Sequence, residues 1–235
     1  MTTFTTVLDR LLRTDAGRPL VTFYDHGTGE RTELSVTTYA NWVAKTASLL
    51  AEEYDLERGQ RLRVDLPTHW LGPVVLGAAW SVGLVVTRDD EPDAVVCGPA
   101  ELARWAGHAD RVPVLASALH PLGLRFPDPL PPGVHDLGVE VWSQPDAFLA
   151  LDPPGPDDLA VDGTTHRELW DAAAARSVLR DGDRVLTEEN PASPSGLSSF
   201  TEPLVRGGSV VLVAHAEPGR LEATYADERA TARFP

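Results

Sequence analysis

Two stretches of this chain repeat one order of elements, and that order restricts the folds open to it. Residues 61–87 and 184–213 each contain an apolar strand, an apolar helix, a glycine turn and a second apolar strand. The strands are continuous apolar runs without alternation, which is typical of parallel strands covered on both faces. The repeat therefore predicts an α/β fold, in which repeated βαβ units form largely parallel sheets covered by helices.

Apolar periodicity and turn residues predict the remaining elements. Outside the repeat, the sequence predicts helices at about 4–14, 35–54 and 165–179, a hairpin of strands 20–24 and 31–34, a strand–helix–strand unit at 94–115 and an amphipathic segment at 220–228.

A proline-rich stretch separates two parts of the chain. We expect a single two-lobed unit, with residues 1–118 as the first lobe, 119–158 as an irregular connection and 159–235 as the second βαβ lobe. Large apolar residues in the connection argue against low-complexity disorder, because they need burial. These residues are Phe126, Trp142, Phe148 and Leu149.

The charge and cysteine content narrow the classes of partner and compartment. A net charge of -15 over 235 residues argues against nucleic acids and anionic membranes as partners, since both attract basic surfaces. Cys97 is the only cysteine, so no intrachain disulfide is possible, and its apolar neighbours predict a buried strand position. The chain has no run of 18 apolar residues and no signal-like N-terminus, so we expect a cytoplasmic protein.

The stretch 157–169 is the part of the sequence closest to a chemical motif. It contains a short strand at 159–161, a tight Asp162-Gly163-Thr164 turn and the start of a helix. Thr165 and Glu168 form the Thr-x-x-Glu pattern of a capping box. Free N–H groups at such a turn can bind an anion, but this turn is short and no lysine or arginine precedes His166-Arg167.

Candidate ligand-binding residues follow from the rule that open α/β sheets bind ligands at the carboxyl ends of their strands. They are Thr164, Thr165, His166, Asn190 and Ser193. The segment Ser193-Pro194-Ser195-Gly196 lacks the spacing of a nucleophile elbow and is expected to cap the following helix. The seven histidines show no metal-ligand spacing, so we expect no metal site. We also expect no cofactor and no catalytic residue.

Six segments in order resemble the adenylate-forming superfamily, which comprises acyl-CoA synthetases, peptide-synthetase adenylation domains and luciferases. The segments are Leu34-Ser35 with Tyr39, Arg58–Leu62, Gly77–Val86, Thr165–Leu169 (THREL), Gly182–Leu186 (GDRVL) and Leu204–Leu212 (LVRGGSVVL). The resemblance covers nearly the whole chain and implies the N-terminal portion of that fold.

Departures from the superfamily pattern argue against its chemistry. Members carry a phosphate loop, S-G-T-T-G-x-P-K-G, where this chain has only Asp162-Gly163-Thr164-Thr165. These residues are either a remnant of the loop or only a helix cap. The aromatic P-L-F-H segment is replaced by Thr187–Pro191, and the later adenine- and ribose-binding segments and the domain with the catalytic lysine are not in the sequence.

Three hypotheses about function remain open. The first is a non-catalytic, degenerate adenylation-domain-like protein that acts as a binding or interaction module. The second is a binder or enzyme acting on a small acyl or nucleotide-like ligand at the strand ends. The third is a subunit completed by a separate chain. We expect a homo-oligomer or a protein partner, because the matched fold normally continues into further strands that cover its sheets.

Overall fold

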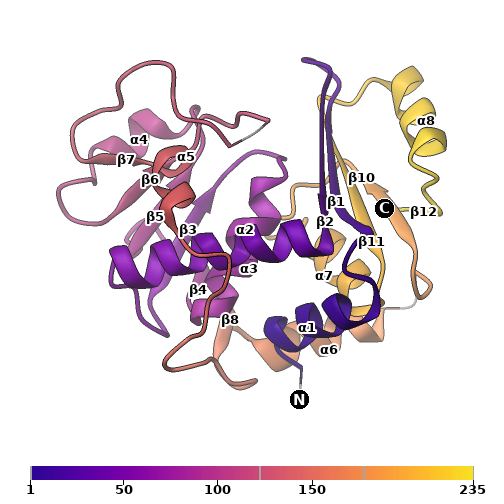
Figure 1. The fold of residues 1–235 in the computed structure, drawn as a ribbon, viewed down its shortest axis with the longest axis horizontal. Helices are drawn as coiled ribbons and strands as arrows, with labels where there is room; N and C mark the ends of the chain where they lie inside the picture. The colour runs from indigo at the N-terminus through magenta and orange to yellow at the C-terminus, as the bar shows by residue number, and fades with distance from the viewer. Residues whose placement is uncertain (1, 122, 177, 235) are drawn as a thin grey trace.

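The structure, a computed structural model, describes residues 2–121, 123–176 and 178–234 (Figure 1). The helices are α1 (Phe4–Asp15), α2 (Val36–Ser48), η1 (Leu49–Glu53), α3 (Leu71–Val82), α4 (Leu102–Ala106), α5 (Leu137–Glu140), η2 (Val141–Ser143), α6 (His166–Ala175), α7 (Ser198–Val205) and α8 (Pro218–Asp227). The strands are β1 (Pro19–Asp25), β2 (Glu30–Ser35), β3 (Arg61–Asp65), β4 (Val85–Thr87), β5 (Ala94–Cys97), β6 (Val114–Ala116), β7 (Val134–Asp136), β8 (Leu159–Val161), β9 (Thr164–Thr165), β10 (Arg184–Thr187), β11 (Ser209–Ala214) and β12 (Ala232–Arg233).

Within the described residues the strands form two largely parallel sheets, which confirms the predicted fold class. The five-stranded sheet has the order β12-β10-β11-β1-β2, and the seven-stranded sheet has the order β7-β6-β5-β3-β4-β8-β9. Both predicted βαβ repeats pair as parallel neighbours, β3 with β4 and β10 with β11. The exceptions to parallel pairing are the edge pairs β1–β2 and β8–β9.

The sheets do not follow the lobe boundaries expected from the sequence. The hairpin β1–β2 lies in the five-stranded sheet, where β1 pairs with β11 from the end of the chain. Conversely, β8 pairs with β4 in the seven-stranded sheet, although it follows the proline-rich stretch. Each sheet therefore contains strands from both parts of the chain. The sequence did not predict this, because pairing between distant strands leaves no trace in local sequence patterns.

The two sheets enclose a central layer of helices that includes α2 and α3 (Figure 1). Alternate residues of one strand serve different layers, as in β11, where Val210 and Leu212 join the central core while Val211 packs toward α8. On the seven-stranded sheet, Val95 and Cys97 pack outward with Trp105 of α4. Strands buried on both faces need apolar residues at every position, which explains the continuous apolar runs.

Aromatic side chains join the central helices to one another. Trp80 of α3 lies between Phe4 of α1 and Trp170 of α6, with ring centroids 5.7 and 5.8 Å away. Trp80 also donates a hydrogen bond from its indole nitrogen to the carbonyl of Ala160, at 3.0 Å. No helix within the described ranges combines the length and the apolar character needed to cross a lipid bilayer.

The proline-rich stretch is more ordered, and its large side chains more exposed, than the sequence predicts. It contributes β7, which extends the seven-stranded sheet beside β6. Phe126 and Phe148 pack against the core, but Trp142 is 52% exposed and Leu149 is 89% exposed. The expectation that Trp142 and Leu149 are buried was wrong, although Trp142 still packs against Trp42 of α2, with ring centroids 5.2 Å apart.

The second half of the chain differs from the prediction at one helix end. The sequence predicts that the helix after Thr165 continues to about residue 179, but α6 ends at Ala175, and residue 177 lies outside the described residues. Arg176 has extended backbone angles, which end the helix. Leu179 is buried, and its N–H donates to Glu202 of α7 at 3.3 Å.

Candidate functional site

The Asp162–Thr165 turn is closed by hydrogen bonds within the chain. The Thr165 hydroxyl caps α6 by accepting from the N–H of Glu168 at 3.2 Å, and the Glu168 carboxylate accepts from the N–H of Thr165 at 2.9 Å. The N–H groups of His166 and Arg167 donate to the carbonyls of Asp158 and Pro156. All four N–H groups that could face an anion at this helix start therefore have acceptors, as in a structural capping box.

The basic side chains beside this turn are also paired. Arg167 lies 2.9 Å from a carboxylate oxygen of Asp157, and Arg58 pairs with both Asp152 and Asp158. These ion pairs are exposed, so each contributes little stability, but together they neutralise the cations that a phosphate would need. The geometry fits the helix-cap interpretation of Gly163-Thr164-Thr165.

A cavity of about 360 Å³, which we call the Arg88 cavity, lies next to the turn. It is formed by the carboxyl ends of β4 and β8, by α3 and by the segment 191–197 that follows β10. Most of its wall is apolar. Its lining residues are Leu76, Val86, Thr87, Arg88, Val161, Asp162, Thr164, Leu169, Pro191, Ala192, Ser193, Pro194 and Leu197. The cavity joins the two sheets, since Arg88 follows a strand of one and Ala192 follows a strand of the other.

Arg88 bridges the two sides of the cavity. Its guanidinium donates to Asp65 Oδ1 at 3.2 Å and to the carbonyl of Ala192 at 2.9 Å. Burial, with the nearby Arg63, lowers the pKa of Arg88. The carboxylate of Asp162 accepts from the Thr87 hydroxyl at 3.0 Å and from the N–H of Arg88 at 2.8 Å. The charged groups of the cavity are thus held in place by partners within the chain.

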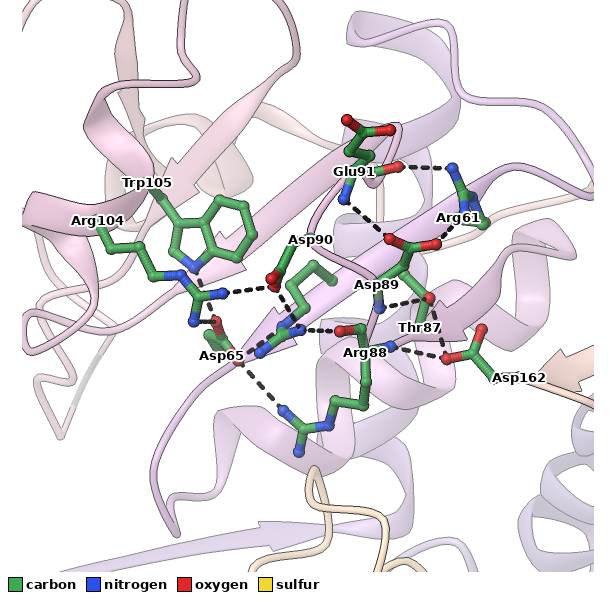
Figure 2. A network of polar contacts seen from close by, with 11 residues as sticks. Arg61, Asp65, Thr87, Arg88, Asp89, Asp90, Glu91, Arg104, Trp105 and Asp162 are labelled. Carbon is green, nitrogen blue, oxygen red and sulfur yellow. Dashed lines mark hydrogen bonds and ion pairs between the residues drawn. The ribbon is translucent and has the colours of Figure 1, made fainter.

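Asp65, at the end of β3, is the centre of the network that fixes Arg88 (Figure 2). Its side chain is 8% exposed and accepts from Arg63 at 2.9 Å and from the Trp105 indole at 2.7 Å, in addition to Arg88. Arg104 approaches its second oxygen at 3.7 Å. Because this carboxylate is buried, removing one of its partners would leave a buried charge or donor unpaired, which is strongly destabilising.

Two of the sequence-predicted residues line the Arg88 cavity, and a third holds a wall segment in place through hydrogen bonds. Thr164 and Ser193 are part of the wall. The Asn190 side chain donates to the carbonyl of Leu66 at 2.8 Å and accepts from the N–H of Ala192 at 3.0 Å, so it ties the 191–197 segment to the end of β3. Thr164 follows β8 of the seven-stranded sheet, whereas Asn190 and Ser193 follow β10 of the five-stranded sheet, so these residues come together where strand ends of the two sheets meet.

The other two predicted residues lie outside the cavity wall. The Thr165 hydroxyl is used in the helix cap. His166 is fully buried, neither of its ring nitrogens has a hydrogen-bond partner in the described structure, and burial lowers its pKa. Thr165 is the N-cap of α6 and His166 is its first residue.

The expectation that the segment Ser193-Pro194-Ser195-Gly196 caps the following helix was wrong. The N-cap position of α7 is Leu197. The Ser193 hydroxyl instead donates to the carbonyl of Asn190 at 2.8 Å and accepts from the N–H of Gly196 at 3.0 Å. It closes a separate turn before the helix begins.

Comparison with known proteins places the chain in a family. No model of a known protein family matches it. A TIGR03089 family protein of Mycobacterium tuberculosis (strain ATCC 25618 / H37Rv) is 36% identical over 245 residues, and the match covers 98% of this chain and 99% of that protein. The chain belongs to the TIGR03089 family. The match therefore extends over nearly the full length of both sequences.

Solved structures identify the fold. An acyl-CoA synthetase from Brucella canis superposes with a TM-score of 0.80 at 18% identity, over 99% of this chain and 47% of that one. A benzoate CoA ligase from Burkholderia xenovorans LB400 gives 0.76 at 18% identity, over 99% of this chain and 50% of the ligase. The TIGR03089 chain thus spans about half the length of these structures and has the fold of the N-terminal portion of the adenylate-forming superfamily.

Sequence reasoning missed three polar residues of the Arg88 cavity. Arg88, Thr87 and Asp162 all lie at or directly after the carboxyl ends of β4 and β8. The strand-end rule that selected Asn190 could also have selected them, because the strands before them were predicted. Across residues 2–121, 123–176 and 178–234, no three His, Cys, Asp or Glu side chains are grouped to hold a metal ion.

Proposed function

We propose that this protein is a non-catalytic binding module built on the adenylate-forming fold, and that it holds a small acyl ligand in the Arg88 cavity. The supporting observation is the cavity itself, with a wall that is mostly apolar and carries a few hydroxyl groups, among them those of Thr164 and Ser193. Its volume of about 360 Å³ is near the lower end of the usual range for ligand sites, which favours a short acyl chain. We also propose a cytoplasmic location, in keeping with a single cysteine.

The absence of adenylating activity is part of this proposal. Adenylation needs groups that stabilise the charge developing on the phosphates, and one such donor contributes roughly 10²–10³ in rate. Beside the turn that would hold those phosphates, the N–H groups of residues 165–168 are bonded within the chain, and the turn carries Asp162. The only lysine, Lys45, lies on α2. It donates to the carbonyl of Gln144, and its Nζ lies 3.0 Å from a carboxylate oxygen of Asp146.

Two measurements test the proposal. Isothermal titration calorimetry with butanamide, pentanamide and benzamide should give saturable binding, and Thr164→Val should weaken it about fivefold through the loss of one hydrogen bond. Glu188→Gln, which alters an exposed residue outside this cavity, is the matched control and should leave the affinity unchanged. Pyrophosphate exchange into ATP with a panel of carboxylic acids should stay at background.

Either of two results contradicts the proposal. Exchange above background would show that the protein adenylates after all. Failure of every neutral acyl compound to bind, with the protein folded by circular dichroism, would show that the Arg88 cavity is not an acyl site.

A second candidate role is that of a subunit in an assembly, and exposed apolar side chains favour it. Leu149 is 89% exposed, Leu151 is fully exposed and Trp142 is half exposed, all on the proline-rich stretch. We propose that this stretch lies in the interface of a homodimer, since two-fold dimers are the commonest oligomers. Light scattering coupled to size exclusion should give twice the 25.4 kDa chain mass, and the double variant Leu149→Ser, Leu151→Ser should give a monomer. A wild-type monomer at high concentration would contradict this role.

A further inference from the structure

A second cavity of about 360 Å³, which we call the His69 cavity, lies at the carboxyl edge of the five-stranded sheet. Asp25 is the last residue of β1, Glu188 directly follows β10 and His215 directly follows β11, so the ends of three parallel strands supply its charged groups. Glu30, at the start of β2, adds a further carboxylate, and His69, from the segment after β3, adds an imidazole ring. None of these residues belongs to the Arg88 cavity.

His69 presents a buried hydrogen-bond donor without an acceptor. Its side chain is buried, and its Nδ1 accepts from the N–H of Leu71 at 3.3 Å. Because Nδ1 is an acceptor, the hydrogen of the neutral ring is on Nε2. Burial, opposed by the charge of Asp25, lowers the pKa of His69 to about 3, so the ring is neutral. Nε2 has no partner in the described structure, and Glu30 Oε1 is 3.9 Å away, beyond hydrogen-bond distance.

The carboxylates of the cavity differ in how well they are paired. Burial opposes ionisation of Asp25, but hydrogen bonds from His215 at 2.9 Å and from the N–H groups of Gly27 and Thr28 hold its pKa below the usual value. Glu30 accepts only from the Thr32 hydroxyl, at 3.1 Å, among the hydrogen bonds of the described residues, and burial raises its pKa.

Glu188 is exposed and lies at the rim of the cavity. Three carboxylates around one small space create a negative potential with no arginine or lysine in the lining.

We propose that the His69 cavity binds a small organic amine. The ammonium group pairs with Glu30, while Asp25 and Glu188 add to the negative potential around it, and an oxygen atom of the same molecule accepts the hydrogen bond from His69 Nε2. The apolar part of the amine packs against Phe23, Pro67 and Leu119 of the wall. An organic cation fits better than a metal ion, because no three metal-ligating side chains are grouped within the described ranges.

Calorimetry with 4-aminobutanamide and with butanamide, which lacks only the amino group, tests this proposal. We expect 4-aminobutanamide to bind about tenfold or more tightly than butanamide at this cavity, because the ammonium meets a cluster of carboxylates. Glu30→Gln should reduce the affinity for 4-aminobutanamide about tenfold or more. Glu188→Gln should reduce it by a smaller factor. Thr164→Val, in the Arg88 cavity, should leave it unchanged, which separates this result from the test of the acyl site.

Thermal melting of each variant checks that it is folded, and the exposed Glu188→Gln keeps the test valid if the buried Glu30→Gln variant is unstable. Nitrogen NMR of His69 gives a second readout, since the Nε2 resonance should shift on addition of 4-aminobutanamide. Equal affinity for the two compounds would overturn the proposal, as would unchanged binding of 4-aminobutanamide by folded Glu30→Gln or Glu188→Gln. Absence of heat and of an Nε2 shift up to about 10 mM 4-aminobutanamide would also overturn it.

Discussion

The Arg88 cavity and the His69 cavity have the same volume and lie at the ends of parallel strands, but their polar groups are paired in opposite ways. In the Arg88 cavity, the cation bonds to Asp65 and Asp162 bonds to Thr87, so the charges are already satisfied. In the His69 cavity, a buried N–H has no acceptor, and the lining carries three carboxylates but no arginine or lysine. The two cavities therefore have similar positions at strand ends, but the pairing of their polar side chains favours ligands of different charge.

The largest expected effect comes from breaking the pairing that supports the Arg88 cavity. Asp65→Asn should lower the free energy of unfolding by about 3–5 kcal/mol, because Arg63 and Arg88 lose a buried anion. Urea denaturation at pH 7 measures this change. The control is Asp90→Asn, whose side chain is 77% exposed and which should cost less than about 0.5 kcal/mol. Similar losses from the two variants would mean that Asp65 is not the centre of the network.

A smaller effect, about 2 kcal/mol, distinguishes the His69 cavity by its pH dependence. The folded protein keeps His69 neutral down to about pH 3, whereas the unfolded chain protonates it near its ordinary pKa of 6.5. The contribution of His69 to the free energy of unfolding is therefore fully present above pH 6.5 and is lost as the pH falls toward 3. At pH 5 the loss is about 2 kcal/mol, from 1.4 kcal/mol per pKa unit.

The comparison of wild type with His69→Phe isolates this term, since both proteins keep the carboxylates Asp25 and Glu30. Urea denaturation at pH 7 and pH 5 should show a loss in the wild type that exceeds the loss in the variant by about 2 kcal/mol. Equal losses would mean that His69 is not held neutral by the fold.

The helix cap beside the Arg88 cavity should have an effect of about 1 kcal/mol. Thr165→Ala removes the hydroxyl that accepts from the N–H of Glu168 and should lower stability by that amount. Thr165→Ser keeps the cap and is the control. If Thr165 belongs to the scaffold, butanamide affinity stays the same in both variants. A loss of affinity in Thr165→Ala would instead make Thr165 a ligand residue.

The smallest expected effect is that of ATP, which should not bind measurably to either cavity. In the Arg88 cavity, Arg88 is already paired with Asp65. In the His69 cavity, the carboxylates of the lining repel a triphosphate, because they lie within a Debye length of about 8 Å. Calorimetry at 1–2 mM ATP, concentrations of the order used for weak ligands, should give no saturable heat. Micromolar affinity would show that the Asp162–Thr165 turn still works as a phosphate loop.

Much of the fold could be predicted from the sequence because its signals are local. Apolar runs bounded by glycine gave both βαβ units, and the Thr-x-x-Glu pattern gave the cap at Thr165. The strand β7 was missed because Val134–Asp136 is short and follows a run of prolines. The exchange of β1 and β8 between the two parts of the chain was also missed, since it depends on pairing between distant residues.

The candidate sites were only partly predictable, for a related reason. Thr164 and Ser193 follow strands, and strand ends can be located from sequence. The importance of Arg88 depends on Asp65, 23 residues earlier, and that of His69 depends on burial and on the N–H of Leu71. A histidine without metal-ligand spacing gives no sign in the sequence that one of its nitrogens will be left without a partner.

The pairing of β1 with β11 also affects how the protein is made. Val21 emerges early from the ribosome, but its partner Val210 follows only after about 190 further residues, which takes on the order of 10–40 seconds at about 5–20 residues per second. During that time one edge of an apolar strand has no neighbour, and this is the kind of surface that chaperones bind and that aggregates form from. The five-stranded sheet is therefore completed late in synthesis, and one edge of its first hairpin stays unpaired until β11 has been made.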